Sequence, residues 1–249
     1  MFEEKDLSEI ALEVKDLYIT YTNMKRYSIK SSLLRFKKAQ KEKTEAVKGI
    51  SFTVEKGDIV GIVGKNGSGK STMLKAIAGI FSPDSGSVDL KGNSISLMSI
   101  GVGFNKELTG RENIALSGLL LGFSDQEILE KEKKIIKFAE LDKFIDMPVR
   151  TYSSGMYSKL AFAITAFLET DIILIDEVLS VGDARFKKKS FKKMKELISD
   201  ENRTVLIVSH STGTLDKLCS KILWINDGDM VMYGPKDEVL PKYDEFMNE

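Results

Sequence analysis

The chain has 249 residues, a length that suits one large α/β domain or a core with a subdomain inserted in it. Lys plus Arg number 37 and Asp plus Glu number 37, so no global field draws the chain to nucleic acid or lipid. Cys219 is the single cysteine, which excludes an intrachain disulfide and favours an intracellular location. The N-terminus is acidic rather than signal-like, and no apolar run approaches the ~20 residues that span a bilayer.

Short β-branched runs alternate with helical patterns along the chain, which predicts a mainly parallel sheet with helices on its faces. We expect buried strands at residues 58–63, 171–175 and 204–208. The stretch 222–233 reads as a terminal hairpin, because its Asp-Gly pair supplies the turn.

Residues 105–168 have a different character, with helical periodicity and few strands. Ser124 and Glu127 form a capping-box pattern at the start of one helix. Apolar residues then return at helical spacing, at Ile128, Leu129, Ile135, Ile136 and Ala139. We therefore expect one α/β domain over 1–249, with a core made of 1–104 and 169–249 and a helical subdomain inserted at 105–168.

Residues 23–45 form a basic insertion, with eight Lys or Arg residues against two Glu and several interleaved apolar residues. One interpretation is a solvated surface segment. The other is an amphipathic segment that lies against an anionic membrane surface or a partner.

A phosphate-loop pattern, G-x-x-x-x-G-K-[ST], occupies residues 64–72 between a predicted strand and a predicted helix. Its glycines let backbone N–H groups converge on phosphates at a helix N-terminus. We expect Lys70 to contact the β- and γ-phosphates of ATP, Ser71 to bind Mg²⁺ and Thr72 to help at the α-phosphate. The nucleotide-binding residues predicted here are Gly64, Lys65, Asn66, Gly67, Ser68, Gly69, Lys70, Ser71 and Thr72.

The predicted strand at 171–175 is followed by two carboxylates, Asp176 and Glu177. Asp176 sits where a carboxylate can hold Mg²⁺ through water, and Glu177 can polarise the attacking water. An apolar run before acidic residues is common, so the phosphate loop upstream is what makes this pair informative.

Ser153, Ser154 and Gly155 open a predicted helix, which places two hydroxyls and a glycine N–H at its N-terminus. Such an arrangement binds anions. Taken alone, the segment also fits an ordinary serine N-cap.

These segments, together with Ser180-Val181-Gly182-Asp183 and Val208-Ser209-His210, follow the order and spacing of ABC ATPases, and the chain resembles that family over almost its whole length. The resemblance implies an ABC-type P-loop NTPase core with a mixed sheet, flanking helices and an inserted helical subdomain. Residues 153–155 resemble the family's signature segment. The likeness further assigns Asp183 to the loop that couples two sites, His210 to a γ-phosphate contact, and Tyr21, after the first strand, to adenine stacking; Tyr18 is the alternative for that stacking.

In that family the domain forms a head-to-tail dimer with ATP between one subunit's phosphate loop and the other's signature segment. The family also works on the cytoplasmic face of the membrane with a separate integral membrane permease, two copies of each. Within it, residues 100–114 and 237–243 resemble exporters of polysaccharides and teichoic acids, most of all the teichoic-acid export subunit of Gram-positive bacteria.

Two departures from the family pattern stand out. The glutamine that links γ-phosphate and Mg²⁺ to the permease should fall near residues 97–101, but the only glutamines are Gln40 and Gln126. Its role is vacant or passes to Ser99 or to backbone. In the signature segment, Ser154 replaces a glycine and Met156 a glutamine, which leaves the Ser153 hydroxyl and Gly155 in place.

The leading hypothesis is therefore an ATPase that powers export of a lipid-linked teichoic acid. The alternatives are an exporter of another surface polysaccharide, a soluble ABC ATPase acting on DNA or ribosomes, and a nucleotide-gated scaffold without turnover. The soluble class is disfavoured because the chain has one cassette and no room for a long coiled coil, so we expect no nucleic-acid partner. The presence of Glu177 disfavours the scaffold.

Overall fold

The computed structural model describes residues 9–24, 41–98, 103–176, 183–200 and 202–248. Glu177, Ser99 and most of the basic insertion, which carry three of the expectations above, lie outside these ranges. Among the described helices, none combines the length and the apolar character that crossing a membrane requires.

Within the described residues, six strands form the central sheet, in the spatial order β5-β6-β7-β3-β8-β9. All neighbouring pairs are parallel except the β8–β9 hairpin, so the predicted mixed sheet and the predicted hairpin are both confirmed. β7 has the predicted bounds, whereas β3 and β6 begin one residue later than predicted. The strands are β3 (Ile59–Val63), β5 (Ile95–Met98), β6 (Ile172–Asp176), β7 (Thr204–Val208), β8 (Lys221–Asn226) and β9 (Asp229–Pro235).

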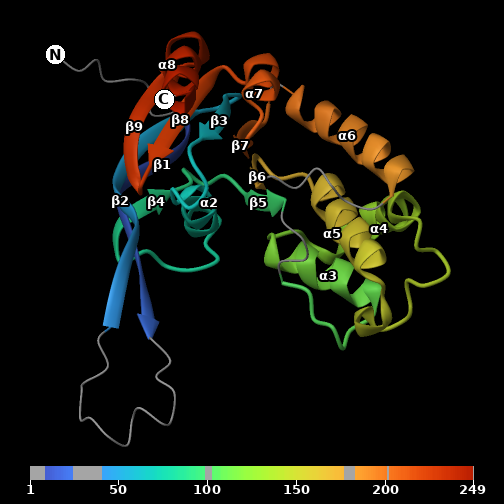
Figure 1. Ribbon diagram of the computed structural model, residues 1–249. Coiled ribbons are helices and arrows are strands. Elements are labelled where there is room, and N and C mark those ends of the chain that lie inside the picture. Colours follow the sequence, from blue (N-terminus) through green and yellow to red (C-terminus); the bar gives the residue numbers. More distant parts are fainter. Residues whose placement is uncertain (1–8, 25–40, 99–102, 177–182, 201, 249) are drawn as a thin grey trace, which may run out of the picture.

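A second, antiparallel sheet has the order β2-β1-β4, with β1 at Ile10–Met24, β2 at Lys41–Glu55 and β4 at Ser85–Asp89. β1 and β2 extend together as a long ribbon beyond the rest of the molecule (Figure 1). The placement of Tyr21 after the first strand was wrong, because Tyr21 lies inside β1 and pairs with Thr44.

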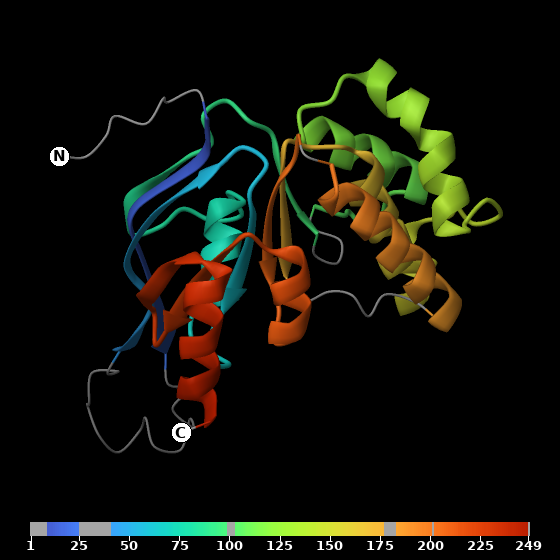
Figure 2. The ribbon, with the colours of Figure 1, turned by 90° about the horizontal axis from the view of Figure 1, so that it is seen from above.

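The central sheet is buried on both faces, as is usual for parallel strands. Along β6, Ile172 and Leu174 join the core shared with α2 and the antiparallel sheet. The alternate residues Ile173 and Ile175 join the core on the opposite face, under α6, α7 and α8. Figure 2 shows the sheets from above with these helices around them. The helices are α2 (Lys70–Ile77), α6 (Ala184–Ile198), α7 (Thr212–Leu218) and α8 (Lys236–Asn248).

Helices α3 (Gly110–Leu120), α4 (Asp125–Ala139) and α5 (Ser154–Phe167), with a 3₁₀ turn at Val149–Thr151, pack together around their own buried cluster beside the sheet (Figure 1). The capping box predicted at Ser124 is confirmed, because Glu127 N–H donates to its hydroxyl and its own N–H donates to the Glu127 carboxylate. The division of the chain into core and helical subdomain stays a prediction.

One residue of the predicted apolar stripe on α4 is not part of the core. Ile128, Ile135 and Ala139 are buried against α3 and α5, whereas the Leu129 side chain is 65% exposed. Successive helical residues point about 100° apart, so Leu129 is turned away from the face that Ile128 buries.

Candidate functional site

Three neighbouring parallel strands, β6, β7 and β3, end at one edge of the central sheet. Val208 of β7 is paired with Ile62 of β3 on one side and with Asp176 of β6 on the other. Because their carboxyl ends coincide, the phosphate loop after β3, the carboxylate of Asp176 and the residues that follow Val208 meet there. This is the usual place for a ligand in an open α/β sheet.

The phosphate loop connects β3 to α2 in a backbone conformation that two glycines make possible. Gly64 and Gly69 have φ of 152° and 101°. A Cβ at Gly64 would lie 2.1 Å from the Ile225 carbonyl oxygen, and one at Gly69 would lie 2.1 Å from that of Ala46. The loop is therefore pressed against two neighbouring strands, while a Cβ at Gly67 would meet nothing within 4 Å.

The side chain of Lys70, the first residue of α2, lies inside the curve of this loop. Its Nζ donates to the carbonyl oxygens of Gly64 at 2.7 Å and Lys65 at 2.8 Å. Burial lowers the pKa of Lys70, and the charge of Asp176 partly offsets that effect. The ammonium is thus held at the centre of the loop. There, the oxygens of a bound phosphate would accept the hydrogen bonds that the carbonyl oxygens accept in this structure.

The side chains of Ser71 and Asp176, both expected from the sequence to bind Mg²⁺, lie in contact with each other. The Ser71 hydroxyl donates to Asp176 Oδ1 at 2.9 Å. Within the described ranges no group of three or more His, Cys, Asp or Glu side chains could hold a metal. Mg²⁺ suits a two-oxygen site better than most ions, because it keeps several waters and takes other ligands from substrate phosphates.

Of the two tyrosines considered for adenine stacking, Tyr21 lies beside the phosphate loop. Its hydroxyl is 3.3 Å from Thr72 Oγ1, and 45% of the residue is exposed. Tyr18 is equally exposed, but its ring packs beside Gly49 on the neighbouring strand. The geometry therefore favours Tyr21 as the candidate.

His210 is exposed two residues beyond the end of β7, at the same sheet edge as Asp176. Its contact with a γ-phosphate stays a prediction, as does the role of Glu177.

The signature segment lies on the helical side of the molecule. Ser153 caps α5 by accepting a hydrogen bond from Met156 N–H at 3.2 Å, so the N-cap expectation and the anion-site expectation describe the same geometry. Ser153, Ser154 and Gly155 line a hollow of about 530 Å³, and no residue of the phosphate loop lines it. The structure therefore does not bring the two predicted halves of the nucleotide site together within one chain.

Two residues at this hollow were missed by the sequence analysis, Lys159 and Glu140. Lys159 donates to Asp183 Oδ2 at 2.9 Å and to Glu140 at 3.4 Å. The Asp183 carboxylate also accepts from Arg185 and Phe186 N–H and so caps α6. Lys159, with help from the Phe186 N–H, lowers the pKa of Asp183 to about 2. Lys159 follows Ser153 on the same helix, but no sequence signal pairs it with Asp183.

The fold and the site define a P-loop nucleotide-binding domain. The family model for the ABC transporter matches residues 47–180. The chain belongs to the ABC transporter family of ATP-binding domains.

Its similar relatives carry two kinds of name. The O-antigen export system ATP-binding protein RfbB of Myxococcus xanthus is 43% identical over 88% of this chain and 51% of its own length. The teichoic acids export ATP-binding protein TagH of Bacillus anthracis is 46% identical over 86% of this chain and 39% of its own length. The chain thus spans about half or less of the length of these two relatives.

Solved structures agree with the fold. An ATP-binding subunit of an ABC transporter superposes with a TM-score of 0.70 at 21% identity, over 94% of this chain and 93% of its own. The ATP-binding cassette MJ0796, solved as a dimer with ADP and Pi, gives 0.68 at 22% identity over 90% and 98%. The predicted ABC-type fold is confirmed.

Proposed function

We propose that the chain is the ATP-hydrolysing subunit of an ABC exporter. The observation that carries this proposal is the hydrogen bond between Ser71 and Asp176, beside the buried ammonium of Lys70. These three side chains place one cation and two metal-ligand oxygens at the mouth of the phosphate loop, as nucleoside triphosphate hydrolysis requires.

In this proposal each residue has a separate task. The phosphate-loop amides and Lys70 bind the β- and γ-phosphates and withdraw charge from the bond that breaks. Ser71 and Asp176 would hold Mg²⁺, which supplies further charge neutralisation when it is bound. Glu177 orients the attacking water and accepts its proton, and His210 contacts the γ-phosphate.

We further propose a head-to-tail dimer. The support is the separation of the half-sites, because the hollow at the signature segment contains Ser153 and Asp183 but no phosphate-loop residue. A second copy can bring its own phosphate loop to this hollow, and the symmetry then completes two sites at once.

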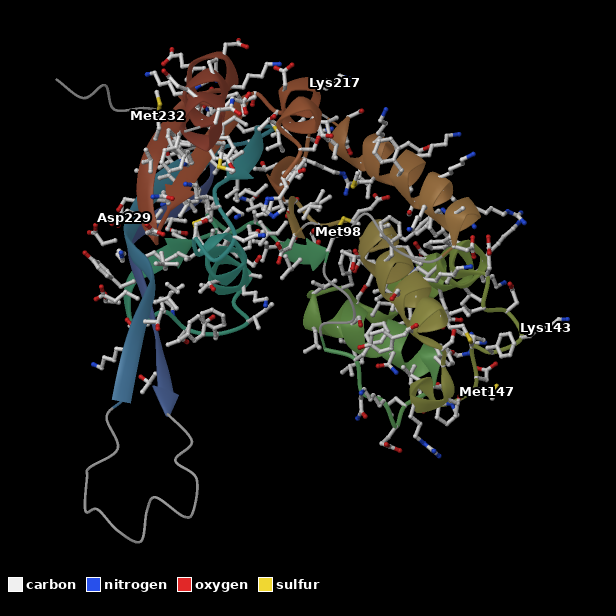
Figure 3. All side chains as sticks on the ribbon, in the orientation of Figure 1. Met98, Lys143, Met147, Lys217, Asp229 and Met232 are labelled. Atoms are coloured by element: carbon white, nitrogen blue, oxygen red, sulfur yellow. The ribbon has the colours of Figure 1, made fainter. Side chains whose placement is uncertain are left out.

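A partner in the membrane is the third element of the proposal. A groove of about 330 Å³ lies between the α2 end, β5, α3 and α5, lined by Ile80, Leu97, Phe104, Ser117 and Leu120 among others. Met98, at the end of β5, lies at the junction of sheet and helices beside it (Figure 3). The exposed fractions of Leu119 and Leu120 are 53% and 67%, so the rim is apolar enough to receive a permease segment on the cytoplasmic side.

For the transported substrate we propose a lipid-linked teichoic acid. The sequence resemblance and the relative named for teichoic acid export support it. A relative named for O-antigen export has a similar identity, so another surface polysaccharide is the competing outcome.

Three measurements test the proposal. The purified chain should hydrolyse ATP only with Mg²⁺ and should co-purify from cells with a polytopic membrane protein. Depletion should leave lipid-linked teichoic acid inside the cell and strip it from the wall. Normal teichoic acid with loss of another glycan would reassign the substrate, and co-sedimentation with ribosomes without a membrane partner would overturn the exporter.

A further inference from the structure

The C-terminal helix α8 touches the phosphate loop from outside. Lys65, the second residue of the loop, is exposed, and its Nζ lies 4.2 Å above the centre of the Phe246 ring. A cation at this distance over an aromatic face is attracted by the ring quadrupole. The loop is thereby tied to a helix that begins at Lys236, far along the chain.

Phe246 is itself held by an aromatic seat made of Trp224 and Tyr243, whose rings meet edge-on or tilted. Its ring lies 5.1 Å from that of Trp224 on β8, and Trp224 lies 5.6 Å from Tyr243 on α8. Trp224 and Tyr243 are 8% and 6% exposed, so this seat is shielded from solvent.

The loop has little freedom on the side that faces β8. A Cβ at Gly64 would lie 2.1 Å from the Ile225 carbonyl oxygen on that strand. The next residue of the loop, Lys65, is the one that α8 contacts, through the Phe246 ring.

The turn after β8 supports the other end of the loop. Gly228 N–H donates to the Ser68 carbonyl oxygen at 3.1 Å. The aromatic seat and this turn both belong to the C-terminal part of the chain, and neither includes a residue assigned to phosphate, metal or catalysis.

We propose that Phe246 is a positioning residue for nucleotide binding, which holds Lys65 so that the phosphate loop is preformed. The inference rests on the proposed function, because it concerns ATP affinity at that loop. Ordering the phosphate loop costs free energy. When α8 has already ordered the loop, ATP binding does not have to supply that cost, so α8 strengthens binding without contacting the ligand.

Phe246→Ala should therefore weaken binding of a fluorescent ATP analogue about two- to five-fold, the factor that an exposed cation–π contact represents. Phe246→Trp should keep wild-type affinity, because the indole face attracts a cation at least as well. Phe246→Leu keeps an apolar contact but no ring, so it should behave like Phe246→Ala. In the variants that bind the analogue more weakly, the KM for ATP should rise by a similar factor, while kcat should stay close to the wild-type value. Met247→Ala, at a neighbouring exposed position of α8, is the matched control.

A double-mutant cycle locates the effect at Lys65. In the Lys65→Met background, Phe246→Ala should change the affinity for the ATP analogue by less than about two-fold, because the cation that the ring attracts is gone. The inference would be overturned if Phe246→Ala lowered the affinity equally in the wild-type and Lys65→Met backgrounds, or if it raised the affinity. Thermal melting of each variant separates loss of folding from loss of affinity, and Phe246→Leu remains a test if the alanine variant unfolds. A wild-type chain that binds no ATP analogue would refute the proposed function instead.

Discussion

The Ser71 hydroxyl donates to Asp176 Oδ1 at 2.9 Å, across 105 residues of sequence. Ser71 belongs to the first turn of α2 and Asp176 is the last residue of β6, two elements that also share the buried core on one face of the sheet. The bond brings a hydroxyl and a carboxylate together at the carboxyl edge of the central sheet.

If this pair holds Mg²⁺, Ser71→Ala should raise the Mg²⁺ concentration for half-maximal turnover at least about ten-fold. Binding of ATP without metal should change much less, because Lys70 and the loop amides remain. The measurement is a Mg²⁺ titration of ATP turnover at saturating ATP. Ser51→Ala, which removes another Ser–Asp hydrogen bond far from the loop, is the control. Equal Mg²⁺ dependence in all three proteins would remove Ser71 from the metal site.

Glu177→Gln keeps size and hydrogen bonding at the predicted general base but removes its charge and basicity. Turnover should fall about 10²- to 10⁴-fold. Less repulsion of the triphosphate should let this variant dimerise on ATP, whereas Lys70→Ala should not dimerise because it binds phosphate poorly. Light scattering with ATP distinguishes the two variants. Near wild-type hydrolysis by Glu177→Gln would exclude Glu177 as the base.

Tyr21→Ala should weaken ATP binding roughly ten-fold, because stacking of a base on an aromatic ring contributes about 1–3 kcal/mol. Tyr18→Ala is the matched control, since Tyr18 is equally exposed but packs at Gly49. A competition experiment with inorganic triphosphate adds a check. Tyr21→Ala should lower the affinity for ATP but not for triphosphate, which has no base to stack on the ring. If Tyr18→Ala has the larger effect, the adenine site lies at Tyr18.

The Asp183 carboxylate should give a measurable pH signature. Its folded pKa of about 2 lies below the ordinary value of about 4, so the contact stabilises the fold above pH 4. That contribution is lost as the pH falls from 4 toward 2. Lys159→Met should raise the pKa of Asp183, and its melting-temperature deficit at pH 7 should shrink as the pH approaches 2.

Carboxyl NMR across this range tests the assignment directly. Lys143→Met, at an exposed lysine outside the Lys159–Asp183 ion pair, is the control (Figure 3). An Asp183 pKa that does not respond to Lys159→Met would mean that the α6 N–H groups alone lower it.

Local signals explain what the sequence predicted. The phosphate loop needs glycines and a lysine at fixed spacing, and β7 is a short run of β-branched residues bounded by polar ones. The Ser124 cap requires only four residues. Each of these features depends only on residues that are close in the sequence, so it can be predicted without knowing the tertiary structure.

What the sequence missed depends on distant partners. β2 contains several charged residues and a glycine, and it becomes a strand by pairing with β1 across more than one irregularity of register. The exposure of Leu129 depends on where α3 and α5 lie, and the Lys159–Asp183 contact depends on how α5 meets α6. None of these arrangements leaves a periodic trace in the sequence.

The position of β3 has a consequence for the order in which the molecule is made. β3 carries the phosphate loop near the start of the chain, yet both its neighbours, β7 and β8, come from residues 204–226. While a ribosome is still making the first four fifths of the chain, β3 is already synthesised but has neither of its neighbouring strands in the central sheet. Nucleotide affinity should therefore appear abruptly as residues 204–226 emerge, and ATP then stabilises only chains whose sheet is complete.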